Sequence, residues 1–175
     1  MSRRPDVEIE HLRRVAGVLT PQPLATRFPE GAAGPSMVVE FAAPATVRGH
    51  GPLRGATVTA SLVYRRSPDP PSAWSLRSYR YALHDRHGTE LLAYHWHPVS
   101  PFPTPSFPHL HVSAALRPAA SDGSRGVLPL DKAHLPTGPV PLAAFARMLV
   151  GEFGVEPRAA DWAARLRPDP GPPPG

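Results

Sequence analysis

The sequence contains no cysteine, and this absence excludes several kinds of site at once. Without thiols the chain forms no disulfide, holds no thiolate-bound metal and uses no cysteine nucleophile. Long apolar runs are also missing, since none approaches the roughly 20 residues that a membrane-spanning helix needs. The N-terminus turns acidic where a signal peptide would be apolar. We therefore expect a cytoplasmic protein that does not contact a membrane.

Lysine and isoleucine are almost absent, with one residue of each among the 175. Arginine is abundant by contrast, and its 18 residues give the chain a formal net charge of +5. Only residues 1–66 are clearly basic, with nine arginines against five acidic residues. This composition is typical of biased codon usage in a GC-rich genome. The charge is therefore a weak indication of a nucleic-acid partner.

Proline and glycine are frequent, with 26 and 14 residues, yet enough apolar side chains remain to form a modest core. The length of the chain fits one domain. We expect a single domain over residues 1–167, followed by a disordered Pro/Gly-rich tail over residues 168–175.

Hydrophobic periodicity predicts helices at both ends of the chain and strands between them. Apolar residues at a spacing of three to four indicate helices over 6–19, 141–154 and 159–166. Alternating or β-branched runs indicate strands over 36–42, 57–65, 76–84, 89–97 and 109–116, with a shorter extended segment at 126–130. Because the strands are clustered, we expect an α+β fold. Its antiparallel sheet would have about five strands, with an N-terminal helix and two C-terminal helices packed on it.

The clearest local signal is a β-hairpin, in which two aromatic-rich runs flank a four-residue turn at 85–88. We pair His84 with Thr89, so that Ser78 opposes His95. In this register the tyrosine and tryptophan side chains share one face, and a slip by one residue would mix the two faces. The opposite, polar face carries Arg80, His84, His95 and His97.

Six of the nine histidines lie within residues 84–111. They include two His-x-His pairs, and alternate residues of a strand point to the same face of a sheet. The candidate site residues are Arg80, His95, His97, His109 and His111, with His134 as a lower-ranked addition.

Three interpretations of these histidines stay open. The neutral imidazoles of the two pairs, His95/His97 and His109/His111, could bind Zn²⁺ or another divalent transition metal. Without any cofactor, one histidine could accept a proton and another donate one during phosphodiester cleavage, while Arg80 stabilises charge on the phosphate. In the third interpretation the same surface binds a partner and performs no chemistry.

A series of short motifs lies within residues 76–153: Tyr79-Arg80-Tyr81, a tight hairpin, Leu91-Leu92-Ala93-Tyr94, Phe107-Pro108-His109-Leu110-His111 and a C-terminal amphipathic helix. Together they resemble the TumE-like toxin family of prokaryotic toxin–antitoxin loci. Where that family tends to have Asp after the tyrosine this chain has His95, and Leu110 replaces one histidine. The resemblance implies a small cytoplasmic toxin with an antitoxin partner, acting on RNA or the translation apparatus. On this interpretation the His/Arg face works without a metal.

Overall fold

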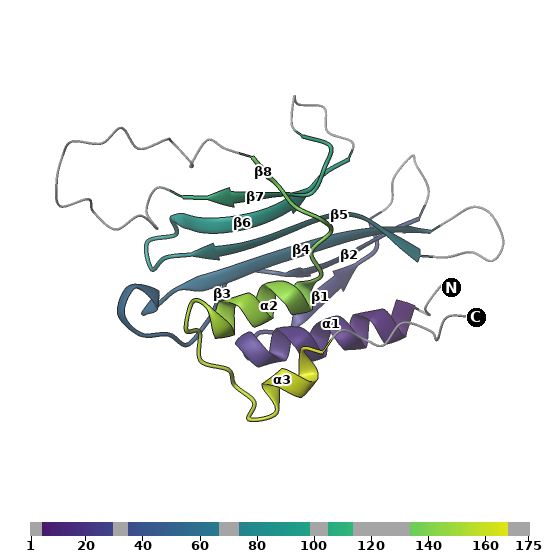
Figure 1. Ribbon diagram of the computed structural model, residues 1–175. Coiled ribbons are helices and arrows are strands. Elements are labelled where there is room, and N and C mark those ends of the chain that lie inside the picture. Colours follow the sequence, from purple (N-terminus) through teal and green to yellow (C-terminus); the bar gives the residue numbers. More distant parts are fainter. Residues whose placement is uncertain (1–4, 30–34, 67–73, 99–104, 114–133, 168–175) are drawn as a thin grey trace, which may run out of the picture.

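The sheet and helices form an α+β fold in the computed structural model, which describes residues 5–29, 35–66, 74–98, 105–113 and 134–167. The strands are β1 (Leu24–Arg27), β2 (Ser36–Phe41), β3 (Ala45–Thr46), β4 (Thr57–Arg66), β5 (Trp74–His84), β6 (Glu90–Trp96), β7 (His109–Val112) and β8 (Leu135–Pro136). Over these residues they form one antiparallel sheet in the order β1-β2-β4-β5-β6-β7-β8, with β3 paired to β4 (Figure 1). The expected class, α+β with an antiparallel sheet, is confirmed.

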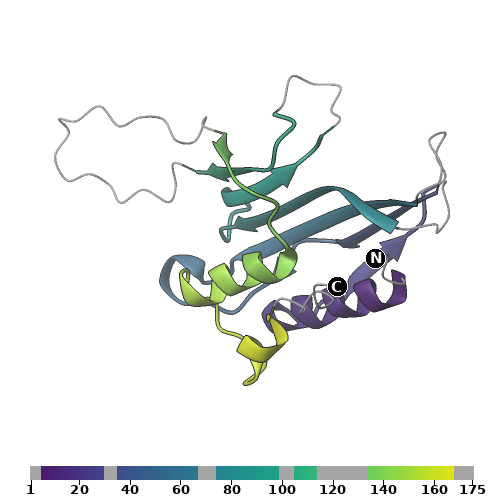
Figure 2. The same ribbon diagram turned by 45° about the vertical axis from the view of Figure 1, so that its right-hand side comes forward.

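Two helices cover one face of the sheet, as Figures 1 and 2 show from two directions. They are α1 (Pro5–Leu19) and α2 (Leu142–Gly151), which contact each other. A short 3₁₀ helix, η1 (Gly51–Leu53), precedes β4. Among the described residues, no helix is both long enough and apolar enough to cross a membrane.

The last helix, α3 (Trp162–Arg165), lies on the far side of α1 from the sheet (Figure 1). Its position follows from the segment before it, in which the backbone N–H of Arg158 donates to the carbonyl of Val18 over 2.8 Å. This hydrogen bond holds the chain against the end of α1. The expectation that both C-terminal helices pack on the sheet is therefore correct for α2 and wrong for α3.

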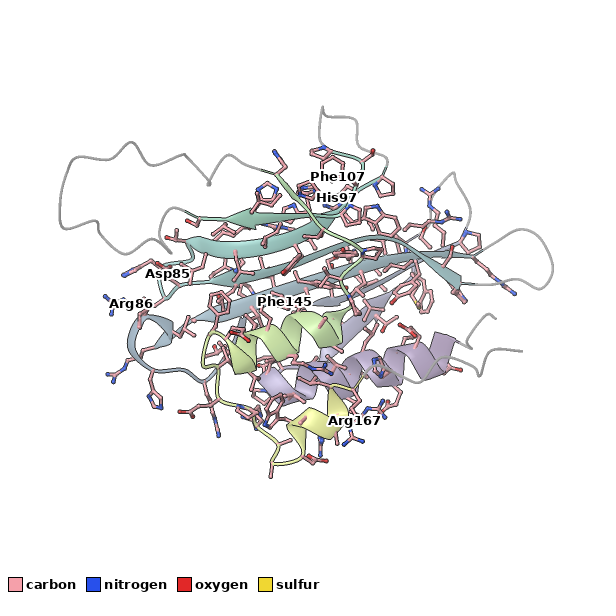
Figure 3. The ribbon with its side chains drawn as sticks, viewed as in Figure 1. Asp85, Arg86, His97, Phe107, Phe145 and Arg167 are labelled. Carbon is pink, nitrogen blue, oxygen red and sulfur yellow. The ribbon has the colours of Figure 1, made fainter. Side chains whose placement is uncertain are left out.

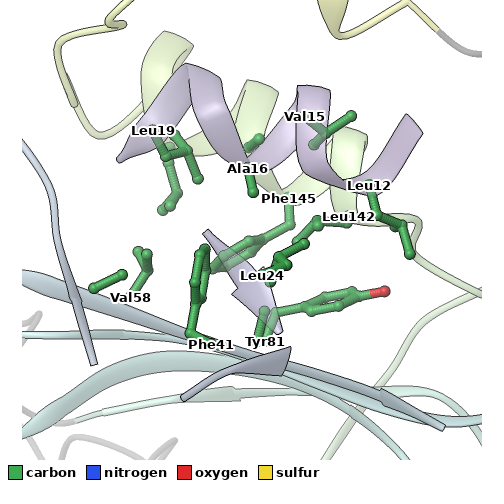
Figure 4. Close-up of a cluster of buried hydrophobic side chains, with 14 of the residues drawn as sticks. Leu12, Val15, Ala16, Leu19, Leu24, Phe41, Val58, Tyr81, Leu142 and Phe145 are labelled. Carbon is green, nitrogen blue, oxygen red and sulfur yellow. The ribbon is translucent and has the colours of Figure 1, made fainter. Parts of the chain in front are cut away.

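The hydrophobic core lies between the two long helices and the sheet (Figure 4). Leu12, Val15 and Leu19 project from α1 at the spacing expected from the sequence, and all three are buried. Phe145 of α2 stacks on Tyr81 of β5 with the ring centroids 5.6 Å apart. Each large apolar side chain buried in this way contributes about 1.5–3 kcal/mol. We therefore expect this layer to supply most of the free energy of folding.

The β5–β6 hairpin forms as expected, but its register differs from the expected one by two residues. His95 pairs with Arg80 rather than with Ser78. Because side chains alternate between the faces with a period of two, this even shift leaves the paired residues of 79–83 and 92–96 on their expected faces, whereas Glu90, beyond the irregularity, contacts Arg80 on the polar face. The separation of a polar face from an aromatic face is therefore confirmed, although the pairing is wrong.

The turn of this hairpin explains the difference in register. The Asp85 carboxylate accepts hydrogen bonds from the backbone N–H groups of His87 (2.8 Å) and Thr89 (2.9 Å), so Thr89 belongs to the turn and not to the strand. His84 pairs with Glu90, and the register then shifts by one further residue at an irregularity beside His84. The longer turn and the irregularity therefore each contribute one residue to the two-residue difference between the expected and the observed register.

Three short strands are not predicted by the sequence, so the expected count of about five strands is wrong. β1, β3 and β8 have two to four residues each, too few for an alternating pattern to stand out. β8 also contains Pro136, a residue type that occurs in sheets mainly at edges. The five predicted strands correspond to β2, β4, β5, β6 and β7. The extended segment expected at 126–130 and the tail at 168–175 lie outside the described residues.

Candidate functional site

The polar face of the hairpin lies on the side of the sheet away from α1 and α2, where Figure 3 labels His97. Arg80 of β5, His95 of β6 and His109 of β7 are directly opposite one another on neighbouring strands. His111 is two residues further along β7 and so shares their face. Because paired residues in an antiparallel sheet lie side by side, the register brings the arginine and three histidines together.

Three of these side chains converge on one point. His95, His109 and His111 each offer one ring nitrogen, and the three nitrogens lie within 4.8 Å of one another. Their ring centroids are 4.7 to 5.6 Å apart. We call these residues the three-histidine cluster. The cluster forms because β6 and β7 are neighbours and the His-x-His spacing directs both β7 rings to the same side.

His109 is the most deeply placed member of the cluster, with 2% of its surface exposed. Its Nδ1 lies 2.8 Å from the backbone carbonyl oxygen of Phe107. Since a carbonyl oxygen only accepts hydrogen bonds, Nδ1 carries the proton. In the neutral ring, Nε2 then keeps its lone pair. The backbone of Phe107 thus fixes both the orientation of this imidazole and the nitrogen that is available to a ligand.

His95 is oriented by Arg80, whose Nε donates a hydrogen bond to His95 Nε2 over 3.3 Å. This nitrogen therefore carries no proton. Burial lowers the pKa of His95 to about 3, and the neighbouring His111 and Arg80 act in the same direction. The imidazole of His95 is consequently uncharged at neutral pH.

His111 presents a nitrogen that has nothing to bind within the described part of the chain. Its Nε2 is buried and makes no hydrogen bond there. Burial lowers the pKa of His111, and the neighbouring His134 and His109 add to the effect. A buried nitrogen without a partner is unfavourable. A ligand bound to His111 Nε2 would remove the free-energy cost of leaving this nitrogen without a partner.

Arg80 supplies the positive charge at the edge of the cluster. A terminal nitrogen of its guanidinium lies 2.7 Å from the Glu90 carboxylate, and 47% of the Arg80 side chain is exposed. No sequence pattern marks Glu90 as a partner of Arg80, because only the observed hairpin register, with its irregularity at His84, brings the two side chains together. A guanidinium has five N–H donors. Beyond its bonds to Glu90 and His95, Arg80 therefore retains donors that could meet an anion.

The two remaining candidates lie at the rim of the three-histidine cluster. His97 stands beside His95 with the ring centroids 5.8 Å apart, and burial lowers its pKa. The lower-ranked His134 comes closer to the centre, with its centroid 4.5 Å from that of His111 and 5.0 Å from that of His109. No spacing pattern in the sequence marks His134, because its place depends on the pairing of β8 with β7.

The chemistry of the cluster follows from its charge state and spacing. Three imidazole nitrogens that lie within 4.8 Å of one another form a donor set suited to a divalent transition metal. Metal-free acid–base catalysis has a further requirement, since one group must carry a proton at the working pH. The lowered pKa values of His95 and His111 oppose that role for these two residues.

Comparisons of the chain with protein-family models, with curated proteins and with solved structures found no match.

Proposed function

We propose that the three-histidine cluster binds a divalent transition metal ion, with Zn²⁺ as the best-suited ion. The proposal is carried by the convergence of one nitrogen from each ring within 4.8 Å. Zinc binds imidazole nitrogen at about 2.0–2.1 Å, so the nitrogens of a tetrahedral site lie about 3.3 Å apart. Small rotations of the three side chains would close the remaining difference.

The protonation of the cluster supports this proposal. A metal binds the deprotonated nitrogen of imidazole, so a ring whose pKa is lowered has less often a proton to lose when the metal binds. Burial lowers the pKa of both His95 and His111. For His109, the hydrogen bond from Nδ1 to the Phe107 carbonyl leaves Nε2 available, as is usual for metal-binding histidines.

Metal binding would compete with one existing hydrogen bond. If His95 binds the ion through Nε2, it releases the bond that Arg80 donates to that atom. The ion pair between Arg80 and Glu90 involves a different nitrogen of the guanidinium and can persist. Arg80 would then lie close to the bound ion with its charge balanced by Glu90.

Calorimetric titration of the untagged, metal-free protein with Zn²⁺ tests the proposal. We expect one ion per chain, and binding about 100-fold weaker in His109→Ala, which loses the most buried ligand. The matched control is His87→Ala, because His87 is exposed in the hairpin turn, away from the cluster. Equal Zn²⁺ affinity of wild type and His109→Ala would contradict the proposal.

A second candidate function is supported by Arg80. Nearly half of its side chain is exposed beside His95, and the remaining guanidinium donors suit a phosphate group. Together with the motifs that resemble the TumE-like family, this arrangement supports a cytoplasmic toxin that acts on RNA and is neutralised by an antitoxin. Its charged contact would be Arg80, with His97, His109 and His111 among the groups next to the substrate.

Induced expression in a bacterial host tests the second candidate. We expect the wild-type chain to slow growth and reduce RNA integrity, and Arg80→Ala to degrade RNA at least about tenfold more slowly and to restore growth, because a lost charged hydrogen bond costs about 1.5–3 kcal/mol. Arg77→Ala is the matched control, since Arg77 is an exposed arginine of the same strand. A harmless wild-type chain, or equal toxicity of Arg80→Ala, would remove this candidate.

A further inference from the structure

His134 reaches the three-histidine cluster from the position just before a third strand, β8. It directly precedes β8, whose Pro136 pairs with His109 of β7. Alternate residues of an extended segment point to the same side, so His134 faces the side of the sheet that carries His109. The ring contacts of His134 with His109 and His111, both T-shaped, agree with this placement.

The order of the strands explains why four histidines gather here. β7 lies between β6 and β8, so its pair His109 and His111 is flanked by His95 on one side and His134 on the other. Around a tetrahedral zinc ion, imidazole centroids lie about 5 Å apart, given metal–nitrogen bonds of about 2.0–2.1 Å. Five ring pairs among these four histidines have centroids 4.5 to 5.6 Å apart. This spacing matches that of ligands to one ion.

His134 can adjust its ring while the chain beside it stays in place. The side chain is exposed, and β8 pairs over only two residues. The residues that follow are anchored, because the N–H of Thr137 donates to the Pro108 carbonyl over 2.8 Å and the N–H of Val140 donates to the Tyr79 hydroxyl over 2.9 Å. A rotation of the His134 ring toward the cluster therefore needs no rearrangement of the sheet.

We propose that His134 is the fourth protein ligand of the ion held by the three-histidine cluster, an inference that rests on the proposed function. Four imidazoles fill the tetrahedral sphere of zinc and leave no position for water or substrate. Closed spheres are typical of structural sites, whereas catalytic zinc keeps one position open. The bound ion then ties β8 to β6 and β7, and so fixes the chain that leads into α2.

Substitution with Co²⁺ tests this inference, because the visible absorption of Co²⁺ reports its coordination. In the wild-type protein we expect a tetrahedral spectrum that added azide leaves unchanged. In His134→Ala we expect Co²⁺ binding about 100-fold weaker and a spectrum that azide shifts, because the anion enters the vacated position. The matched control is His87→Ala, which removes an exposed histidine of the hairpin turn and should keep the wild-type affinity and resistance to azide.

The outcomes separate this inference from the proposed function. If azide shifts the wild-type spectrum, or if His134→Ala binds Co²⁺ as tightly as wild type, then His134 is not a ligand and only the three-histidine site stands. If the wild-type protein binds neither Co²⁺ nor Zn²⁺, both proposals fail. Circular dichroism of metal-free His134→Ala monitors the fold, and we expect unchanged melting because the His134 side chain is exposed.

Discussion

Burial determines the charge of the residues at the site. The pKa of His95 falls to about 3 and that of His111 is also lowered, in both cases chiefly because burial penalises the charged ring. Neighbouring His111 and Arg80 lower the pKa of His95 further, and His134 and His109 do the same for His111. Such rings present lone pairs rather than protons at neutral pH. This property favours a cation as the ligand and opposes the interpretation in which His95 and His111 transfer protons without a metal.

The lowered pKa of His95 predicts a loss of stability in acid for the metal-free protein. In the unfolded chain the imidazole has a pKa near 6.5 and binds a proton as the pH falls below that value. The folded protein, with the His95 pKa at about 3, does not bind it in this range. The contribution of His95 to stability is therefore complete above pH 6.5 and is lost as the pH falls from 6.5 toward 3.

Urea unfolding at pH 7 and pH 5 measures this loss. We expect the free energy of unfolding to fall by about 1 kcal/mol through His95, after a discount for solvent screening of a partly exposed ring. The groups that face His95 and add to the effect are Arg80 of β5, His97 of β6, and His109 and His111 of β7. His95→Gln should reduce the dependence on pH. An equal loss in wild type and His95→Gln would show that other groups cause it.

Among the elements, those with a repeating pattern over many residues are predictable from the sequence. β4 and β5 have ten and eleven residues, and β4 alternates between half-buried and buried positions from Thr57 to Tyr64, so the amino-acid pattern reveals these long strands. β3 and β8 have two residues each and exist because a neighbouring strand supplies hydrogen bonds. No local pattern encodes such strands, since their stability comes from tertiary pairing.

The site, too, has one part that the sequence predicts and another part that depends on tertiary pairing. The His-x-His spacing predicts that His109 and His111 share a face, whereas their approach to His95 depends on the pairing of β7 with β6. The position of His134 depends on a pairing with β7 that the sequence does not encode locally. The contact of Arg80 with Glu90 depends on the hairpin turn. Because the Asp85 carboxylate binds the N–H groups of His87 and Thr89, the turn includes Thr89 and is one residue longer than the four-residue turn expected from the sequence.

At the scale of the whole molecule, one sheet separates the core from the site. The helices α1 and α2 cover the aromatic face (Figure 1), and the histidines of the site share the opposite face, where Figure 3 labels His97. Neighbouring positions of one strand therefore serve different purposes. Tyr81 stacks against Phe145 in the core, whereas Arg80, its neighbour in sequence, contacts His95 and Glu90 on the opposite face. Substitutions on the two faces should consequently affect different properties of the protein.

Phe145→Leu tests this separation from the core side. Phe145 is almost fully buried, with its ring stacked on Tyr81 and edge-on to Tyr94 at 6.3 Å. Its replacement by leucine loses both aromatic contacts and leaves a small void, which should cost about 1–2 kcal/mol. In a chain of this length that cost lowers Tm by about 3–6 °C. Because the sheet intervenes, Zn²⁺ affinity measured well below Tm should stay at the wild-type value. A parallel loss of affinity would mean that the geometry of His95 and His109 depends on the packing of α2, and that the two faces of the sheet are coupled.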